Sequence, residues 1–339
     1  MQEIKVTLII PCRNEENYIE ECINSALKQT YKNVEILVVD GMSEDKTRDI
    51  VKNMSSIHNN IRLINNFKMI TPCALNIGIE ESSGQAIIII GAHSYLDEKF
   101  VENNVRNLYE KGYDCSGGVI ETINENYIGG LISKAMSCPF GVGNALFRYT
   151  DKELEVDTVP FGAYKKETLN KIGYFDTELV RNQDDELNLR LINNGGKILL
   201  SPDIKSKYYS RGSLKKLWKQ YFQYGFWKVR VIQKHKKPAS LRHLVPIIFV
   251  LSLIFLGFGS LFSNIIRWAL LSEVLLYLIL GFSFGIKISN DRNIKSIFIL
   301  PLIFFILHFS YGLGFGLGII NFYFKSNEDI INENTKISR

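Results

Sequence analysis

The chain has little of what secreted, zinc-binding or P-loop proteins need. Its five cysteines are an odd number, and no two of them have CxxC spacing. This pattern excludes a fully paired disulfide framework and a zinc-finger site, and it predicts buried thiols in a reducing compartment. No basic segment followed by a short apolar run opens the sequence, so no signal peptide is expected. The phosphate-binding pattern GxxxxGK[ST] is missing, which counts against a P-loop nucleotide-binding domain of a transporter.

Acidic residues are missing from one long stretch. Between Ile204 and His243 the chain has 12 Lys or Arg and no Asp or Glu, although the formal net charge of the whole chain is only +5. A block of this kind directly before apolar segments predicts contact with an anionic membrane surface or with phosphate groups. Nucleic acid is the other usual partner of a basic block, and the apolar segments that follow make it the weaker alternative.

Three long apolar stretches, residues 244–266, 268–286 and 296–324, then follow. About 20 apolar residues suffice to cross a bilayer, so three membrane helices are expected, with buried helices of a soluble core as the alternative. The excess of Lys and Arg on the N-terminal side places the preceding part in the cytoplasm. Three crossings would then place the C-terminal tail on the non-cytoplasmic side of the membrane. In the third stretch, glycines 312, 314, 316 and 318 form two overlapping GxxxG spacings, which permit close helix packing.

The first 200 residues alternate between two hydrophobic periods. Short buried-strand runs are expected at residues 5–10, 34–39, 61–64 and 86–90, and helices between them at 17–27, 45–54 and 72–81. This alternation predicts parallel βαβ units, in which ligands bind beyond the carboxyl ends of the strands. The expected ligand-binding segments are therefore residues 11–15, 40–45, 65–66 and 91–93.

Several motifs together resemble family 2 glycosyltransferases with the GT-A fold. They begin with PCRNEE at 11–16 and VVDGMSEDKT at 38–47, and continue with VDTVPFGA at 156–163 and RNQDDELNLRL at 181–191. These and the later motifs, QYFQYGFWK at 220–228 among them, are similar to the succinoglycan-type, ExoA-like branch. The resemblance runs to about residue 250. It implies a GT-A Rossmann-like, mostly parallel sheet domain followed by transmembrane helices.

The resemblance also implies roles for individual residues. Asp184 matches the catalytic base, and its neighbours Asp185 and Glu186 leave that assignment open by one position. Single displacement at an anomeric carbon needs one carboxylate that takes the proton of the attacking hydroxyl. The nucleotide pocket would be lined by Pro11, Arg13, Asn14, Glu15, Asp40, Asn76, Ala92 and Arg211. Asp157, Asp185, Glu186, Gln220, Gln223 and Trp227 would lie on the acceptor side.

Two motifs depart from the family pattern. The metal motif at the end of the fourth strand is normally Asp-x-Asp or Asp-Ala-His, whereas this chain has Gly91-Ala92-His93. His93 remains as a candidate ligand for Mn²⁺ or Mg²⁺, and the missing acid leaves metal dependence open. Without a metal, Arg211, Lys215 and Lys216 would offset the charge of the leaving diphosphate. The Gln-x-x-Arg-Trp motif appears as Gln223-Tyr-Gly-Phe-Trp227, so either Gln220 or Gln223 fills the acceptor-side position.

These features predict four regions: a glycosyltransferase domain at 1–205, basic amphipathic helices at 206–243, a transmembrane region at 244–325 and a polar tail at 326–339. The helix around 214–225 is equally compatible with lying on a membrane surface and with packing on the enzyme core. The expected function is inverting transfer of a sugar, most commonly from a UDP-hexose, to a lipid-linked (polyprenyl) saccharide. We expect this at the cytoplasmic face of the plasma membrane. A non-catalytic nucleotide-sugar-binding subunit of a polysaccharide assembly complex is the main alternative. A transporter and a processive synthase fit less well.

Overall fold

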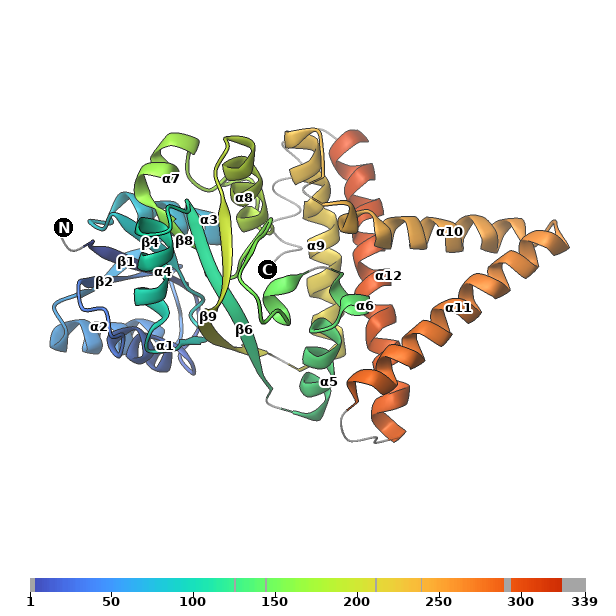
Figure 1. The fold of residues 1–339 in the computed structure, drawn as a ribbon, viewed down its shortest axis with the longest axis horizontal. Helices are drawn as coiled ribbons and strands as arrows, with labels where there is room; N and C mark the ends of the chain where they lie inside the picture. Colours follow the sequence, from blue (N-terminus) through green and yellow to red (C-terminus); the bar gives the residue numbers. More distant parts are fainter. Residues whose placement is uncertain are drawn as a thin grey trace. The chain divides into compact units, whose positions relative to one another are not determined.

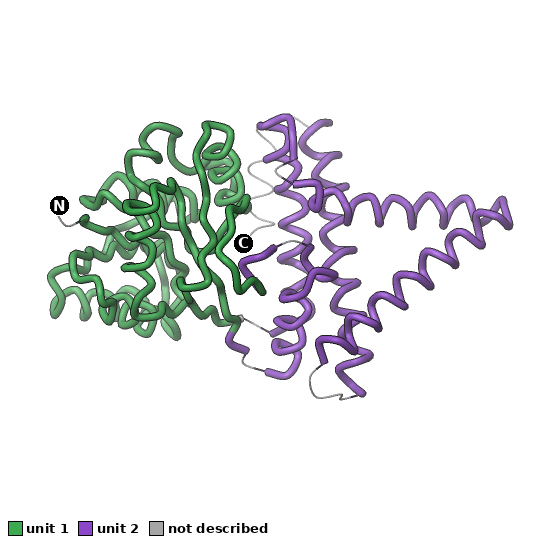
Figure 2. Tube along the Cα trace, viewed as in Figure 1, with its two compact units in different colours: residues 1–122, 149–209 green, residues 123–148, 210–339 purple. Residues whose placement is uncertain are grey.

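The computed structural model describes residues 4–124, 126–143, 145–210, 212–238, 240–289 and 294–324, apart from the side chain of Ser210. The chain forms two compact units (Figures 1 and 2). The first comprises residues 1–122 and 149–209, and the second comprises residues 123–148 and 210–339. The segment between residues 123 and 148 therefore belongs with the C-terminal helices, although strands of the first unit flank it in sequence.

Four parallel strands form one half of the sheet in the first unit. They lie in the order β3-β2-β1-β4, and helices α1 to α3 connect them (Figure 1). Nearly every side chain of β1 and β2 is buried, which explains their uninterrupted apolar sequences. The parallel arrangement expected from the sequence is confirmed. The bounds are β1 (Val6–Cys12), α1 (Ile19–Leu27), β2 (Val34–Asp40), α2 (Thr47–Ile57), β3 (Ile61–Asn65), α3 (Thr71–Glu80) and β4 (Ala86–Ile89).

The other half of the sheet is built from antiparallel pairs. The order continues from β4 through β8, β6 and β9 to β5, and β7 pairs with β9. The sheet is thus mixed. Its elements are β5 (Ser94–Leu96), α4 (Phe100–Tyr109), β6 (Cys115–Asn124), β7 (Leu154–Glu155), β8 (Ala163–Lys165), α7 (Lys166–Ile172), α8 (Gln183–Asn193) and β9 (Ile198–Ser210).

Apart from the ends of β6 and β9, the described secondary structure of the second unit is helical. Three of its segments are long and apolar enough to cross a membrane: Leu241–Gly259, Asn264–Ile288 and Ile294–Phe324. The apolar run predicted at 244–266 ends earlier, because the chain turns after Gly259 and Ser263 takes the extended N-cap conformation of the next helix. The elements are α5 (Tyr127–Met136), α6 (Pro139–Val142), the 3₁₀ turn η1 (Leu146–Arg148), α9 (Leu214–His235), the 3₁₀ turn η2 (Leu241–His243), α10 (Val245–Gly259), α11 (Asn264–Ile288) and α12 (Ile294–Phe324).

Glycines bring α12 very close to two other helices. A Cβ atom added to Gly314 would lie 2.0 Å from the carbonyl oxygen of Phe222 on α9, and one added to Gly312 would lie 2.4 Å from that of Pro246 on α10. The close packing predicted from the GxxxG spacings is confirmed. Within the second unit, the buried face of the basic helix α9 packs against α12.

Candidate active site

Two loops at the carboxyl edge of the parallel strands are tied together. Cys12 at the end of β1 is in register with Asp40 at the end of β2. Asn14, with a left-handed φ of 56°, donates its backbone N–H to Ser43 Oγ at 2.9 Å and accepts the Glu44 N–H at 2.9 Å. The two loops therefore form one rigid rim at the edge where a parallel sheet binds its ligands.

Asp40 is the buried centre of this rim. Its side chain is fully buried, and its oxygens accept hydrogen bonds from the Ser43 hydroxyl and N–H and from Arg48. Arg48 also donates to Asn65 at the end of β3, at 2.8 Å. Burial, and next the adjacent Asp40 carboxylate, raises the pKa of the Cys12 thiol far above its ordinary value, so this thiol stays protonated at neutral pH.

His93 and Glu15 face each other beyond the ends of β4 and β1. The imidazole Nδ1 lies 3.5 Å from Glu15 Oε1, and the ring makes an edge contact with Tyr208, with 4.7 Å between the ring centroids. Among the described residues, no three His, Cys, Asp or Glu side chains gather as a metal site. The pair thus supplies at most two protein ligands, and a divalent ion here would need the rest from a bound diphosphate or water.

The segment 157–163 borders the position where the family's acid is missing. Ile89 at the end of β4 donates its N–H to the Gly162 carbonyl at 3.1 Å. A Cβ atom on Gly91 would lie 3.3 Å from the ring of Phe161. The missing side chain at position 91 therefore leaves little empty space, because the Phe161 ring lies over the glycine.

Helix α8 presents its three acids in three different environments. Asp184 is exposed in the first turn, Asp185 is half-buried and Glu186 is buried. Glu186 accepts two hydrogen bonds from Arg190, at 3.0 and 2.7 Å. Arg190 also donates to the carbonyls of residues 172, 173 and 174, so that Glu186 and Arg190 hold the loop before α8. Of the three acids, Asp184 is the one most accessible to a substrate.

A buried amide joins α8 to the segment 157–163. Asn188 donates to Thr158 Oγ1 at 3.0 Å and accepts from the Tyr164 hydroxyl at 2.8 Å. Asp184 lies one turn before Asn188 and on the same side of the helix. Burial, followed by the neighbouring Cys115 and the negative charge of Asp184, raises the pKa of Tyr164 well above its ordinary value. The charge of Asp184 thus helps to keep the Tyr164 hydroxyl protonated.

Other predicted pocket residues have structural contacts. The side-chain amide of Asn76 makes two 2.9 Å hydrogen bonds with the backbone of Phe175, which anchors the loop between α7 and α8. Ala92 is buried in the core of the first unit. Pro11, Arg13 and Asp157 are half-buried.

The remaining predicted residues fall in the second unit or outside the described residues. Gln220 donates to the Tyr224 hydroxyl at 2.8 Å. Gln223 and Trp227 are buried, and Trp227 contacts Phe226 and Phe322 with centroid distances of 5.7 and 5.8 Å. Arg211 lies outside the described residues.

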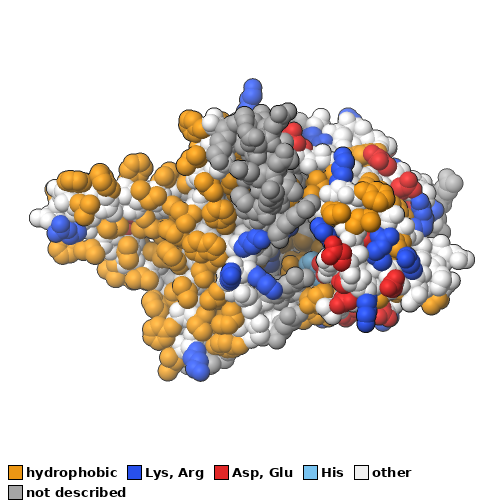
Figure 3. Space-filling view, turned by 180° about the vertical axis from the view of Figure 1, so that it is seen from behind, with side chains coloured by type: hydrophobic (Ala, Val, Ile, Leu, Met, Phe, Trp, Pro, Cys, Tyr) orange, Lys and Arg blue, Asp and Glu red, His pale blue; other side chains and the backbone are white. Residues whose placement is uncertain are grey.

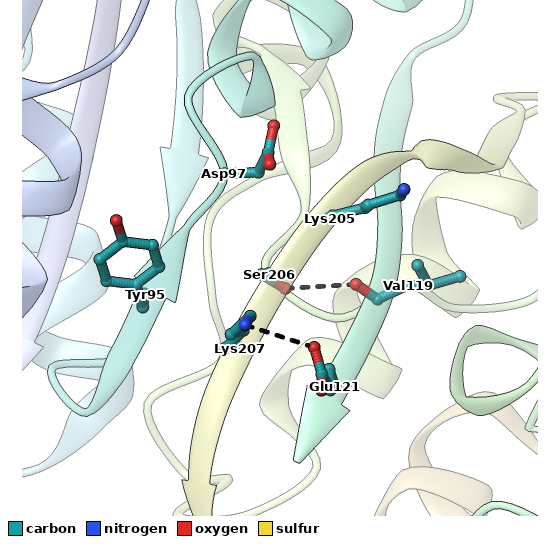
Figure 4. A pocket seen from close by; sticks show the side chains of 7 residues that line it. All are labelled: Tyr95, Asp97, Val119, Glu121, Lys205, Ser206 and Lys207. Atoms are coloured by element: carbon teal, nitrogen blue, oxygen red, sulfur yellow. Dashed lines mark hydrogen bonds and ion pairs between the residues drawn. The ribbon is translucent and has the colours of Figure 1, made fainter. Parts of the chain in front are cut away.

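A small pocket of about 190 Å³ lies elsewhere in the first unit, between β5, β6 and β9 (Figure 4). Lys207 and Glu121 pair across it at 3.7 Å, and Ser206 Oγ donates to the Val119 carbonyl at 3.4 Å. None of the predicted site residues lines it. The lining residues are Tyr95, Asp97, Val119, Glu121, Lys205, Ser206 and Lys207.

Sequence reasoning missed Arg48, Asn188 and Tyr208 as parts of this region. Arg48 directly follows the recognised motif at 38–47, and Asn188 lies within the motif at 181–191, where its position one turn after Asp184 is the signal that could have found it. Tyr208 carries no sequence signal, because the pairing of β5 with β9 brings it to His93.

Comparisons with known proteins agree with this architecture. Residues 7–173 match the model of glycosyl transferase family 2. The chain is 33% identical over 325 residues to a Methanococcus voltae protein named dolichyl N-acetyl-alpha-D-glucosaminyl phosphate 3-beta-D-2,3-diacetamido-2,3-dideoxy-beta-D-glucuronosyltransferase, covering 93% of this chain and 97% of that protein. It is 23% identical over 318 residues to the succinoglycan biosynthesis protein ExoA of Rhizobium meliloti, with 93% and 95% covered.

Among solved structures, the mannosyltransferase PcManGT from Pyrobaculum calidifontis in complex with GDP-Man and Mn²⁺ has a similar fold. The TM-score is 0.58 at 17% identity, with 94% of this chain and 87% of that chain covered. The first unit therefore has a GT-A-like fold, and three apolar helices long enough to cross a membrane follow it. The chain belongs to glycosyl transferase family 2 and is a glycosyltransferase.

Proposed function

We propose that this enzyme transfers a sugar from a nucleotide sugar to a lipid-linked saccharide, with inversion at the anomeric carbon. The observation that carries the proposal is the exposed Asp184 in the first turn of α8, which Asn188 fixes against the segment beside the Gly91–His93 turn. A UDP-hexose is the proposed donor. The proposed nucleotide pocket comprises the rim residues Pro11, Arg13, Asn14, Glu15 and Asp40, together with Asn76 and Ala92.

In the proposed reaction Asp184 accepts the proton of an acceptor hydroxyl as its oxygen attacks the anomeric carbon. The new glycosidic bond forms on one face of the sugar. The bond to the diphosphate oxygen breaks on the other face, and the nucleoside diphosphate leaves with the electron pair. One carboxylate is enough for this single displacement, whereas a retaining glycosidase uses two carboxylates about 5 Å apart.

A divalent ion would offset the charge of the leaving diphosphate. His93 and Glu15 are the proposed protein ligands, and they do not form a complete set by themselves. We therefore derive no step through a metal. Arg211 and the exposed Lys215 and Lys216 at the start of α9 are proposed to share this role.

The acceptor is proposed to be a polyprenyl- or dolichyl-linked saccharide. Support comes from the name of the Methanococcus voltae relative, which describes a dolichyl-phosphate-linked sugar, and from the apolar helices that would hold the enzyme at a membrane. We propose that five residues lie on the acceptor side: Asp157, Asp185, Gln220, Gln223 and Trp227. Glu186 would shape this side indirectly, through its hydrogen bonds with Arg190. A catalytic domain of about 205 residues would face the cytoplasm, at the plasma membrane.

The test is sugar transfer by the detergent-purified chain, from labelled UDP- and GDP-sugars to a short polyprenyl-diphosphate saccharide, with and without Mn²⁺. Asp184→Asn should lower turnover by about 10²-fold or more, and calorimetry should show nearly unchanged donor affinity. Asp185→Asn, at the neighbouring position on the proposed acceptor side, should lower turnover much less than Asp184→Asn does. The reverse pattern would move the base to Asp185. A wild-type protein that binds the donor and transfers nothing would favour the non-catalytic subunit.

A further inference from the structure

The apolar surface of the second unit is concentrated on the hairpin of α10 and α11. Within the most apolar window of each helix only 11% of the residues are buried, compared with 50% for α12 (Figure 3). Exposed side chains on the hairpin include Ile248, Phe255, Phe258, Phe262, Ile265, Trp268 and Leu275. The two arms pack antiparallel, with Phe249 stacked on Tyr277 at 4.7 Å and Gly259 against Ile266 at the tip. An exposed apolar surface of this extent marks a contact with a membrane or with another protein, and the length and composition of the two helices favour the membrane.

Helix α12 contacts both feet of this hairpin, and it also reaches Tyr277 in the middle of α11 through His308, at 2.8 Å. A Cβ atom on Gly312 would lie 2.4 Å from the Pro246 carbonyl oxygen, at the start of α10. Gly281 and Gly285, near the end of α11, lie against Pro301 and Leu300. Figure 1 shows α12 as the third side of a triangle whose other sides are α10 and α11. Both feet of a membrane hairpin lie at one face of the bilayer, so a helix that joins them runs along that face.

The basic helix α9 follows α12 side by side. Trp218 contacts Phe309 with a centroid distance of 6.2 Å, and Gln233 donates to the Phe322 carbonyl at 2.8 Å. Helix α9 carries six Lys or Arg: 215, 216, 219, 228, 230 and 234. If α12 crossed the bilayer, α9 would have to cross beside it. Each Lys or Arg near the centre of the hydrocarbon would then cost about 2.5–3.5 kcal/mol on insertion scales.

The length of α12 agrees with an in-plane position. Its 31 residues extend over about 46 Å, well beyond the roughly 30 Å of hydrocarbon. One side is buried against protein. The exposed apolar side chains lie near its two ends, with Phe298 and Leu302 at one end and Ile320 and Phe324 at the other, whereas residues 303–316 are buried or half-buried.

We propose that the hairpin of α10 and α11 is the only part of the described chain that enters the bilayer, and that α12 lies in the plane of the interface beside α9. The chain then crosses twice instead of three times. The ends of α9 and α12 lie on the same side, and the tip with Arg267 and the exposed Trp268 reaches the opposite headgroups. A basic residue and an indole are typical of that level.

Single introduced cysteines test this topology in sealed, oriented vesicles that contain the full chain. All five native cysteines are buried, so a membrane-impermeant maleimide should label them weakly. The reporters are Lys237→Cys after α9, Phe262→Cys at the tip and Tyr323→Cys at the end of α12, all at exposed positions. Lys237→Cys and Tyr323→Cys should be labelled from one side, and Phe262→Cys from the other.

Labelling of Tyr323→Cys and Lys237→Cys from opposite sides would overturn the in-plane helix, and labelling of all three from one side would overturn the crossing hairpin. A second measurement avoids substitutions within the fold. A protease-sensitive tag appended after the last residue of the native chain should be cleaved from the side that labels Lys237→Cys. Cleavage from the other side contradicts the proposal, because it requires an odd number of crossings.

Discussion

The hydroxyl group of Tyr164 on β8 donates a 2.8 Å hydrogen bond to the buried side chain of Asn188 on α8. Asn188 donates in turn to Thr158 at 3.0 Å. One amide thus fixes the helix that carries Asp184 to the strand and loop beside the end of β4. The orientation of the proposed base therefore depends on a buried residue that no reacting group needs to touch.

Replacing Asn188 by Leu should destabilise the protein by about 1–3 kcal/mol, because the buried Tyr164 hydroxyl loses its acceptor. Tyr164→Phe removes the same hydrogen bond with a smaller loss. The double variant should lose less free energy of unfolding than the two single variants lose together, because both members of the hydrogen-bonded pair are then absent. Chemical unfolding of all three variants in detergent measures this. Strictly additive losses would show that the pair does not act as a unit.

Arg48→Met should destabilise the protein by about 3–5 kcal/mol, because it leaves the fully buried Asp40 carboxylate without its counter-charge. Arg62→Met is the matched control, since the ion pair of Arg62 with Glu81 has both side chains about half exposed. Its effect should stay within about 1 kcal/mol. Thermal unfolding measures the stability of both variants, and nucleotide titration measures how tightly each binds a nucleotide. Equal effects on stability would contradict a structural role for Arg48 beneath the nucleotide rim.

The carboxylate of Glu35 should make stability depend on pH. Burial raises its pKa, but hydrogen bonds from Thr7 and Ser83 and the charge of Lys5 outweigh burial, and the net pKa lies below the ordinary 4.5. A depressed pKa in the folded state stabilises the fold above pH 4.5, and this stabilisation is lost as the pH falls through the folded value. The difference in unfolding midpoint between wild type and Glu35→Gln should therefore shrink from pH 7 towards pH 3. A difference that does not change with pH would contradict this assignment.

Gly91→Asp should restore the acid that the family motif has and this chain lacks. Its Cβ atom would lie 3.3 Å from the Phe161 ring, so the ring must shift by a few tenths of an ångström. Together with His93, the new carboxylate should strengthen Mn²⁺-dependent binding of a nucleoside diphosphate by about tenfold or more. Gly91→Asn, equal in size and uncharged, is the control. Calorimetry that shows the same metal dependence in both variants would exclude position 91 as a ligand.

Hydrophobic periodicity was enough to predict the parallel half of the sheet. Strands buried on both faces must be uninterrupted apolar runs, and the runs around Leu8, Ile36 and Ile88 stand out for that reason. Motifs at the strand ends placed Asn14, Glu15, Asp40 and His93 at one edge of the sheet. The antiparallel half was not predicted, because short strands such as Ala163–Lys165 have no period of their own and depend on neighbours far away in sequence.

By itself, the sequence determined the family, the α/β class and the presence of three long apolar helices, since these follow from local motifs and composition. Only the tertiary structure decided how Asp184, Asp185 and Glu186 differ, because burial and the partner Arg190 are properties of packing. The same holds for α12. Its composition is that of a membrane span, yet its neighbours are a basic helix and the two feet of a hairpin, and contacts of this kind cannot be read from a hydropathy profile.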